Sequence, residues 1–154
     1  MTVPRDVVSG SEQFRDWLVA LKERAMLGST NQSYAMLRAV LHEVRDRLPL
    51  DEALRFADAL PPLVRGIMLE AWHPERAAGG GAAETRPSFL DAVKVRLEPH
   101  QPPPDSIVED ALAVLAQRTP PNSLPILSEH MPPELREAWR DAVGAGRGTS
   151  PAPS

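Results

Sequence analysis

The histidines are the residues of this chain whose chemistry depends most directly on spacing. They are His42, His73, His100 and His130. Metal sites in helical bundles use the pattern Glu-x-x-His, because side chains three residues apart share one face of a helix. Glu70 and His73 have this spacing, but a two-metal site needs a second such pair, and the positions 71 residues further on hold Asp141 and Gly144. Pro74 directly follows His73 and ends a helix. We therefore expect no metal site, with Glu70 and His73 at an exposed helix end.

The known sequence motifs of catalysis do not occur in this chain. It contains no cysteine, which excludes a thiol nucleophile, a thiolate zinc site and an iron–sulfur cluster. It has no Gly-x-Ser-x-Gly, Gly-x-Gly-x-x-Gly or phosphate-binding Gly-Lys-Ser/Thr sequence. The glycines at 79–81 lack a preceding strand and a following lysine, so we interpret them as part of a linker. We expect no catalytic residue, no cofactor and no enzymatic activity; an enzyme of the carboxylate–histidine type is the third hypothesis.

Three other side chains are candidates for binding. Trp72, at the expected end of the fourth helix, is a candidate for a surface or groove contact, because tryptophan is enriched at interaction hot spots. Trp17 and Trp139 lie instead on apolar stripes, which predicts that they are core residues. Arg65 and Arg136 each follow a Pro-Pro pair, where they are expected to bond the carbonyls that end the preceding helix, with anion binding as the alternative. Arg65, Trp72 and Arg136 are therefore our candidate interaction or ligand residues.

The helices that must position these residues are marked by proline. The chain has 17 prolines, and nearly all lie between segments whose apolar residues recur with helical spacing. The first helix is expected from about Ser11 to Leu27, with Ser9 and Glu12 at capping-box spacing. The remaining helices are expected at residues 31–48, 51–60 and 62–72, from 87 onward, after 105, at 122–130 and from 133 onward. No alternating apolar run long enough for a pair of strands occurs.

The two halves of the chain are related by a shift of 71 residues. The shift superimposes Pro49 on Pro120 and Pro61-Pro62 on Pro132-Pro133, together with many apolar positions. It also places Arg65 on Arg136. Since prolines and apolar residues match in one ungapped register, we predict an all-α fold: a helical bundle of about eight helices built from two related four-helix repeats.

This reading divides the chain into five segments. We expect a flexible N-terminal segment at 1–10, a first helical repeat at 11–73, a flexible linker at 74–86, a second helical repeat at 87–143 and a disordered tail at 144–154.

One set of residues carries a family resemblance. It comprises residues 39–49 (AVLHEVRDRLP), Glu52-Ala53, Ala59-Leu60-Pro61, Val64-Arg65-Gly66 and Trp72. In this order they closely resemble the bacterial domain of unknown function 2267 family (DUF2267). The resemblance extends over about residues 12 to 140 and is strongest in the first half. It implies a small helical protein of two related halves, and it brings no established activity.

The charge of the chain argues against nucleic acid as a partner. With 17 basic and 21 acidic residues the formal net charge is −4, whereas nucleic-acid-binding domains are usually basic. The N-terminus lacks the apolar core of a secretory signal, and no apolar run approaches the roughly 18 residues that span a bilayer. We expect a cytoplasmic bacterial protein that binds neither nucleic acid nor membrane.

The function predicted from these observations is that of a non-enzymatic helical interaction or scaffolding module. Its expected partner is another protein. The alternative is a small regulatory ligand-binding protein with a pocket between the two helical repeats, for which Arg65, Trp72 and Arg136 are the candidate residues.

Overall fold

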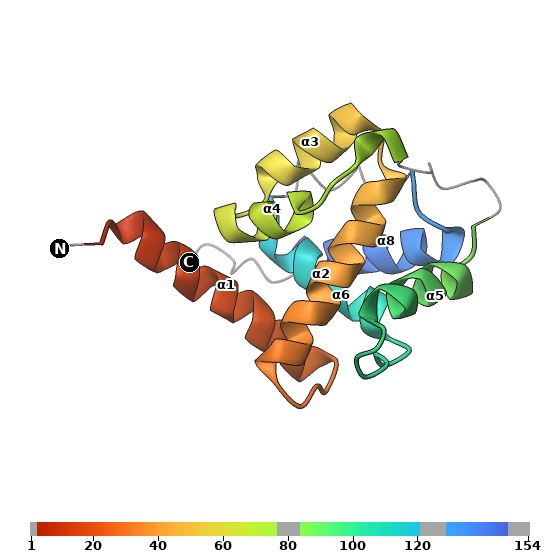
Figure 1. Ribbon diagram of the computed structural model, residues 1–154, viewed down its shortest axis with the longest axis horizontal. Coiled ribbons are helices and arrows are strands. Elements are labelled where there is room, and N and C mark those ends of the chain that lie inside the picture. The colour runs from red at the N-terminus through yellow and green to blue at the C-terminus, as the bar shows by residue number, and fades with distance from the viewer. Residues whose placement is uncertain (1–2, 77–83, 121–128, 148–154) are drawn as a thin grey trace.

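The structure is a computed structural model, and it describes residues 3–76, 84–120 and 129–147. Within these ranges the regular elements are all helical and no strand occurs, which confirms the all-α part of the predicted fold (Figure 1). The α-helices are α1 (Arg5–Arg24), α2 (Thr30–Arg47), α3 (Leu50–Ala59), α4 (Pro62–Leu69), α5 (Arg86–Leu97), α6 (Ile107–Arg118) and α8 (Pro133–Arg147). The helix predicted at 122–130 lies almost entirely outside the described residues.

Helix α1 begins earlier than the sequence pattern predicts. Its first residue is Arg5, so residues 5–10, expected to be flexible, are helical. The predicted cap at Ser9 is wrong, because Ser9 lies inside the helix and Pro4 occupies the N-cap position. Proline has a φ close to that of a helix and Asp6 complements the positive end of the helix dipole, so the chain can enter the helix here without a capping side chain.

Proline ends α2 and α3 as predicted. Leu48 and Leu60 both precede a proline and both adopt extended backbone angles, which stop the helix. At the other end of α2, the Ser29 side chain accepts a hydrogen bond from the Gln32 backbone. These local rules therefore set both ends of α2 and the C-terminal end of α3.

Helix α4 ends before the predicted boundary at Trp72. Its last residue is Leu69; Glu70 is extended and Ala71 has a φ of 51°, in the left-handed region. Glu70 and His73 consequently do not share a helical face, and the spacing argument for a metal pair does not apply to them. A short 3-10 turn, η1 (Pro74–Arg76), follows within the predicted linker. At the C-terminus, α8 continues to Arg147, beyond the predicted start of the tail at 144.

A single hydrophobic core joins all the α-helices. Helix α6 lies at its centre and packs against α8, α1 and α2. Eight of the twelve residues of α6 are buried. Helix α2 packs on α1, α4 and α5. The largest fully buried side chains are Trp17, Trp139, Phe56 and Phe89, which confirms the prediction that Trp17 and Trp139 are core residues. In the described part of the chain, no helix combines the length and the apolarity needed to cross a membrane.

Candidate functional site

Several charged side chains of α2 are used within the fold. Arg45 is 3% exposed, and its guanidinium donates hydrogen bonds of 2.9 Å to the backbone carbonyls of Met68 and Glu70. These carbonyls end α4, where a helix leaves its last acceptors without internal partners. Arg45 also pairs with Asp46 at 2.9 Å. Arg45 therefore caps α4 from the neighbouring helix.

The next charged residues of α2 connect it to α5. Glu43, which is 8% exposed, pairs with Arg47 on its own helix and with Arg96 near the end of α5. Arg47 also pairs with Glu84, just before α5, and its guanidinium carbon lies 4.2 Å from the centre of the Phe89 ring. The stretch from His42 to Arg47, the centre of the family resemblance, therefore forms an internal polar network.

His42 completes this network at the end of α4. Its Nε2 lies 2.7 Å from the Ile67 carbonyl oxygen, which can only accept, so Nε2 carries the hydrogen. Burial lowers the pKa of His42 below its usual value; the hydrogen bond to Ile67 opposes this shift, and the positive charges of nearby arginines, led by Arg45, add to it. The folded protein therefore favours a neutral imidazole.

This lowered pKa predicts a pH-dependent stability. In the unfolded chain His42 titrates near 6.5, above its pKa in the folded chain, so between the two values the unfolded chain binds more protons. The stability that His42 contributes is complete above the unfolded pKa and is lost as the pH falls toward the folded pKa. Urea unfolding at about pH 7 and about pH 5 should show a smaller change in His42→Gln than in the wild type. The exposed His73→Ala is the control and should behave like the wild type; an equal change in His42→Gln would contradict the prediction.

Arg65 bonds the carbonyls that end the preceding helix, as the sequence predicts. It donates hydrogen bonds of 2.9–3.0 Å to the carbonyls of Ala57, Asp58 and Leu60, at the end of α3. Arg136 donates in the same way to the carbonyl of Met131, at 3.0 Å. Both guanidinium groups are thus used by carbonyls of the chain, which leaves little support for a shared anion site.

Trp72, Glu70 and His73 lie close together in sequence but have separate surroundings. Trp72 is half-buried and packs against the core, and its Nε1 has no hydrogen-bond partner among the described residues. Glu70 pairs with Arg38 at 3.0 Å, which lowers the pKa of Glu70, whereas His73 pairs with Glu75 at 3.6 Å. Glu70 and His73 are exposed, as expected, and each is paired with a different side chain and not with the other.

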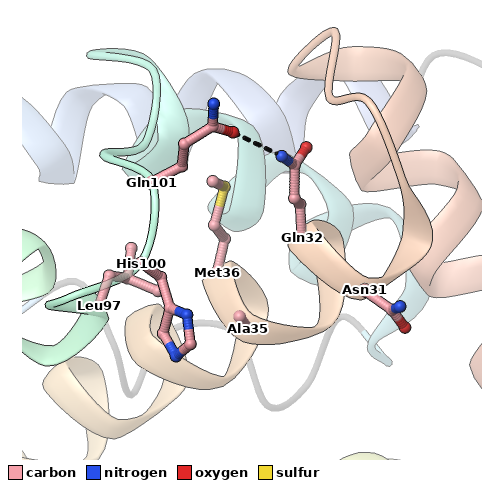
Figure 2. Close-up of a pocket in the computed structure, with 7 residues that line it drawn as sticks. All are labelled: Asn31, Gln32, Ala35, Met36, Leu97, His100 and Gln101. Carbon is pink, nitrogen blue, oxygen red and sulfur yellow. Dashed lines mark hydrogen bonds between the residues drawn. The ribbon is translucent and has the colours of Figure 1, made fainter.

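A small cavity lies between α2 and the segment that follows α5 (Figure 2). It measures about 320 Å³ and is lined by Gln32 and Met36 from α2 and by Leu97, His100 and Gln101 from the other side. Gln32 donates a hydrogen bond of 2.7 Å to Gln101 across one edge of it. The cavity joins the two halves of the chain, as the ligand-binding alternative requires, but none of Arg65, Trp72 and Arg136 lines it.

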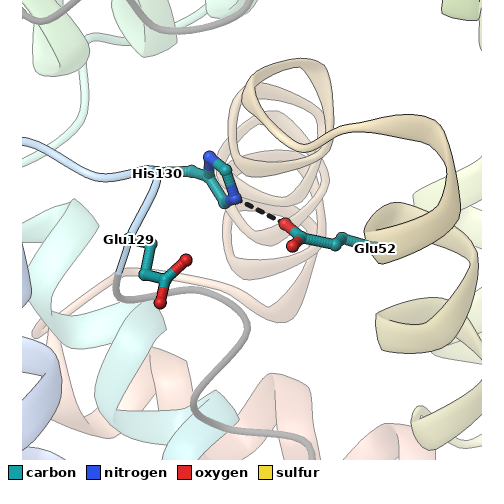
Figure 3. Close-up of side chains that lie close together, drawn as sticks. All are labelled: Glu52, Glu129 and His130. Carbon is teal, nitrogen blue, oxygen red and sulfur yellow. Dashed lines mark ion pairs between the residues drawn. The ribbon is translucent and has the colours of Figure 1, made fainter.

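A cluster of two glutamates and a histidine also joins the two halves of the chain. Glu52 of α3 meets Glu129 and His130, which precede α8, with one ligand atom of each within 4.8 Å of the others (Figure 3). The sequence analysis missed this group because Glu52 is far from His130 along the chain and no helical spacing relates them. Only the packing of α3 against the segment before α8 brings them together.

The N-terminal part of α1 extends beyond the rest of the molecule (Figure 1). In α1, Trp17 and Leu21 are buried, whereas Val7 is 59% exposed and Val8 46% exposed. We call residues 5–13 the projecting segment. The later part of α1 is held by the core, by an ion pair of 2.7 Å between Asp16 and Arg118, and by one of 3.4 Å between Arg24 and Asp110.

These features define an all-helical protein whose conspicuous charged motif stabilises its own fold. The chain belongs to the DUF2267 family: the model of this family, described as "Uncharacterized conserved protein (DUF2267)", matches residues 14–149, most of the chain. The resemblance seen in the sequence is thereby confirmed. None of the curated proteins matches this chain.

Proposed function

We propose that this protein is a non-enzymatic interaction module of the bacterial cytoplasm, built from two related helical repeats, that binds an amphipathic helix of another protein. The projecting segment of α1 is the single observation that supports this function most directly. A helix that extends from its own core with exposed apolar side chains offers a surface on which a second helix can pack.

Equivalent contacts in the two halves support the repeat architecture. Arg65 donates to the Leu60 carbonyl, and Arg136 donates to the Met131 carbonyl. Donor and acceptor of the second bond each lie 71 residues after their counterparts in the first. The first helix of each half also packs on the second helix of the other half, α1 on α6 and α5 on α2. An ion pair joins the helices at each contact: Arg24 with Asp110 between α1 and α6, and Arg96 with Glu43 between α5 and α2.

The spacing of the apolar residues on α1 favours a helical partner. Val7, Gly10, Phe14, Trp17 and Leu21 recur at alternating intervals of three and four, which is the spacing of a coiled-coil seam. Trp17 and Leu21 fill the core, and Val7 and Gly10 continue the same seam into the projecting segment. The seam therefore runs from the core of this protein toward a site where another helix can extend it.

Gly10 adds a second argument for close approach by a partner. Glycine inside a helix costs about 1 kcal/mol relative to alanine, and a Cβ at Gly10 would meet no atom of the described residues within 4 Å. Packing against the described part of the chain therefore does not require glycine here. A helix crossing at Gly10 would gain from its missing side chain, because the two backbones can approach closely.

The size of the surface predicts a transient complex. The projecting segment comprises little more than two helical turns, which bury less than the roughly 1,200 Å² typical of stable complexes. Asp6 lies beside the seam and would favour one orientation of the partner helix, whereas Arg5 and Glu12 lie on the opposite face of α1.

Site-specific photo-crosslinking in the native host tests this function. A photoreactive residue at position 7 should capture a peptide from another protein whose apolar residues recur at intervals of three and four. The same residue at position 95 is a matched control, because Val95 is 65% exposed on α5, away from the seam. Val7→Asp should weaken binding about tenfold, since a buried valine contributes about 1.5 kcal/mol. Val8→Asp, about 100° around the helix, should not.

Two outcomes would contradict the proposal. Capture of the same peptides from positions 7 and 95 would show that the contact is not specific to the seam. Dimerisation of the purified chain in sedimentation equilibrium, abolished by Val7→Asp, would make the partner a second copy of this chain and not a different protein.

The cavity between α2 and the segment after α5 supports a second candidate, the binding of a small uncharged ligand. Its wall combines Met36 and Leu97 with the amides of Gln32 and Gln101, and such a mixture is common in small-molecule sites. This function does not involve α1. Val7→Asp would leave it intact, so the variants designed for the first candidate separate the two.

A further inference from the structure

Glu52, Glu129 and His130 form a cluster that the proposed interaction does not use. Glu52 lies in the first turn of α3, whereas Glu129 and His130 lie in the turn that leads into α8. Figure 3 shows the His130 ring and the Glu52 carboxylate pointing at one another, with Glu129 beside them. The cluster thus connects two segments that are distant along the chain.

Glu52 and His130 are in close contact but do not form a hydrogen bond. His130 Nε2 and Glu52 Oε2 lie 2.5 Å apart, and the two side chains are only 26% and 25% exposed. Both atoms are shielded from solvent, and neither has a hydrogen-bond partner among the described residues. A hydrogen on Nε2 could relieve the repulsion between these two atoms by donating to Oε2, but the two groups do not have the geometry of a hydrogen bond. A cation bound by both atoms is the other way to relieve it.

The charge count favours a divalent cation over a proton. A proton on His130 gives the ring one positive charge, while Glu52 and Glu129 together carry two negative charges. A divalent cation would balance both carboxylates and accept the lone pair of Nε2 as well. The three ligand atoms, all within 4.8 Å of one another, lie close enough to bind a single ion, because metal–ligand bonds of about 2.0–2.2 Å place neighbouring ligands roughly 3–4 Å apart. His130 Nε2 and Glu52 Oε2, at 2.5 Å, would move slightly apart when the ion binds.

We propose that Glu52, Glu129 and His130 bind one divalent transition-metal ion. The imidazole ligand favours zinc or iron over magnesium, calcium and manganese, which prefer oxygen ligands. Water would complete the coordination, because only three protein ligands are present. The bound ion would join α3 to the segment before α8 and so stabilise the contact between the two halves.

Metal titration of the untagged, metal-free protein tests this site. Isothermal titration with zinc chloride should show one tight site per chain, with weaker binding of manganese, as expected for nitrogen and oxygen ligands, and no comparable binding of magnesium. His130→Ala and Glu52→Gln should weaken zinc binding by at least about tenfold, because even the loss of an outer-shell contact commonly costs that much. Glu129→Gln should also weaken it, and because this side chain is exposed, the variant should fold normally.

His73→Ala is the matched control, since His73 also pairs with a glutamate but lies on the surface. It should retain the zinc affinity of the wild type. Circular dichroism of each metal-free variant separates a lost ligand from a lost fold. The proposal is overturned if the wild type binds no stoichiometric zinc, if His130→Ala or Glu129→Gln keeps the wild-type affinity, or if His73→Ala loses it equally.

Discussion

Trp17→Ala is expected to lower the free energy of unfolding by about 3–5 kcal/mol, the usual cost of truncating a buried tryptophan. Trp17 is 1% exposed, and with Leu21 it is one of the two side chains of α1 that are buried. Its removal leaves a cavity between α1 and the helices on which α1 packs, which are α2, α4 and α6. Urea unfolding followed by circular dichroism measures the loss.

Trp72→Ala is the matched control for this prediction. Trp72 is only half-buried, at the edge of the same core, so its truncation should cost less than half as much as that of Trp17. A loss for Trp72→Ala as large as that for Trp17→Ala would show that Trp72 contributes to the core as fully as Trp17, contrary to their different burial.

Arg45→Ala is expected to cost about 3 kcal/mol, because it removes a buried charged group together with its partners' hydrogen bonds. The carbonyls of Met68 and Glu70 each accept a bond of 2.9 Å from Arg45. Without the guanidinium, the Met68 carbonyl would remain unpaired where water has little access, whereas the Glu70 carbonyl is only partly buried. The end of α4 would also lose its connection to α2. The loss is measured by urea unfolding, as for Trp17.

Two further variants test why Arg45 matters. Arg45→Lys keeps the charge but should recover only part of the stability, because an ammonium lacks the planar guanidinium whose Nη1 donates to both carbonyls while its Nε donates to Asp46. Arg55→Ala removes an arginine whose ion pair with Asp51 is exposed, and it should change stability by less than about 0.5 kcal/mol. Equal losses for Arg45→Ala and Arg55→Ala would contradict a specific role for the buried network.

Much of the helical architecture could be predicted because the controlling interactions are local. A proline restricts the residue before it, and this alone places the ends of α2 and α3 at Leu48 and Leu60. Core positions such as Trp17 and Trp139 follow from the spacing of apolar residues. The prediction failed at the start of α1, where a capping signal at Ser9 was preferred to the equally local effect of Pro4.

The roles of the polar residues were harder to predict because they depend on partners far along the chain. The stretch from His42 to Arg47 identifies the family, yet its spacing alone does not show that Arg45 bonds the end of α4 or that Glu43 meets Arg96. Trp72, proposed as a contact residue, proved to be half-buried. Glu70 and His73 had the spacing of metal ligands, but α4 ends before either residue.

Residues within one or two turns of each other are enough to predict the all-helical class and the ends of α2 and α3, and the order of residues along the chain is enough to recognise the family. The surroundings of the histidines follow instead from the packing of distant segments. His130, and not His73, meets a carboxylate shielded from solvent, with Glu52 and Glu129 around it. That meeting depends on how α3 packs against the segment before α8, and no spacing along the chain encodes such a contact directly.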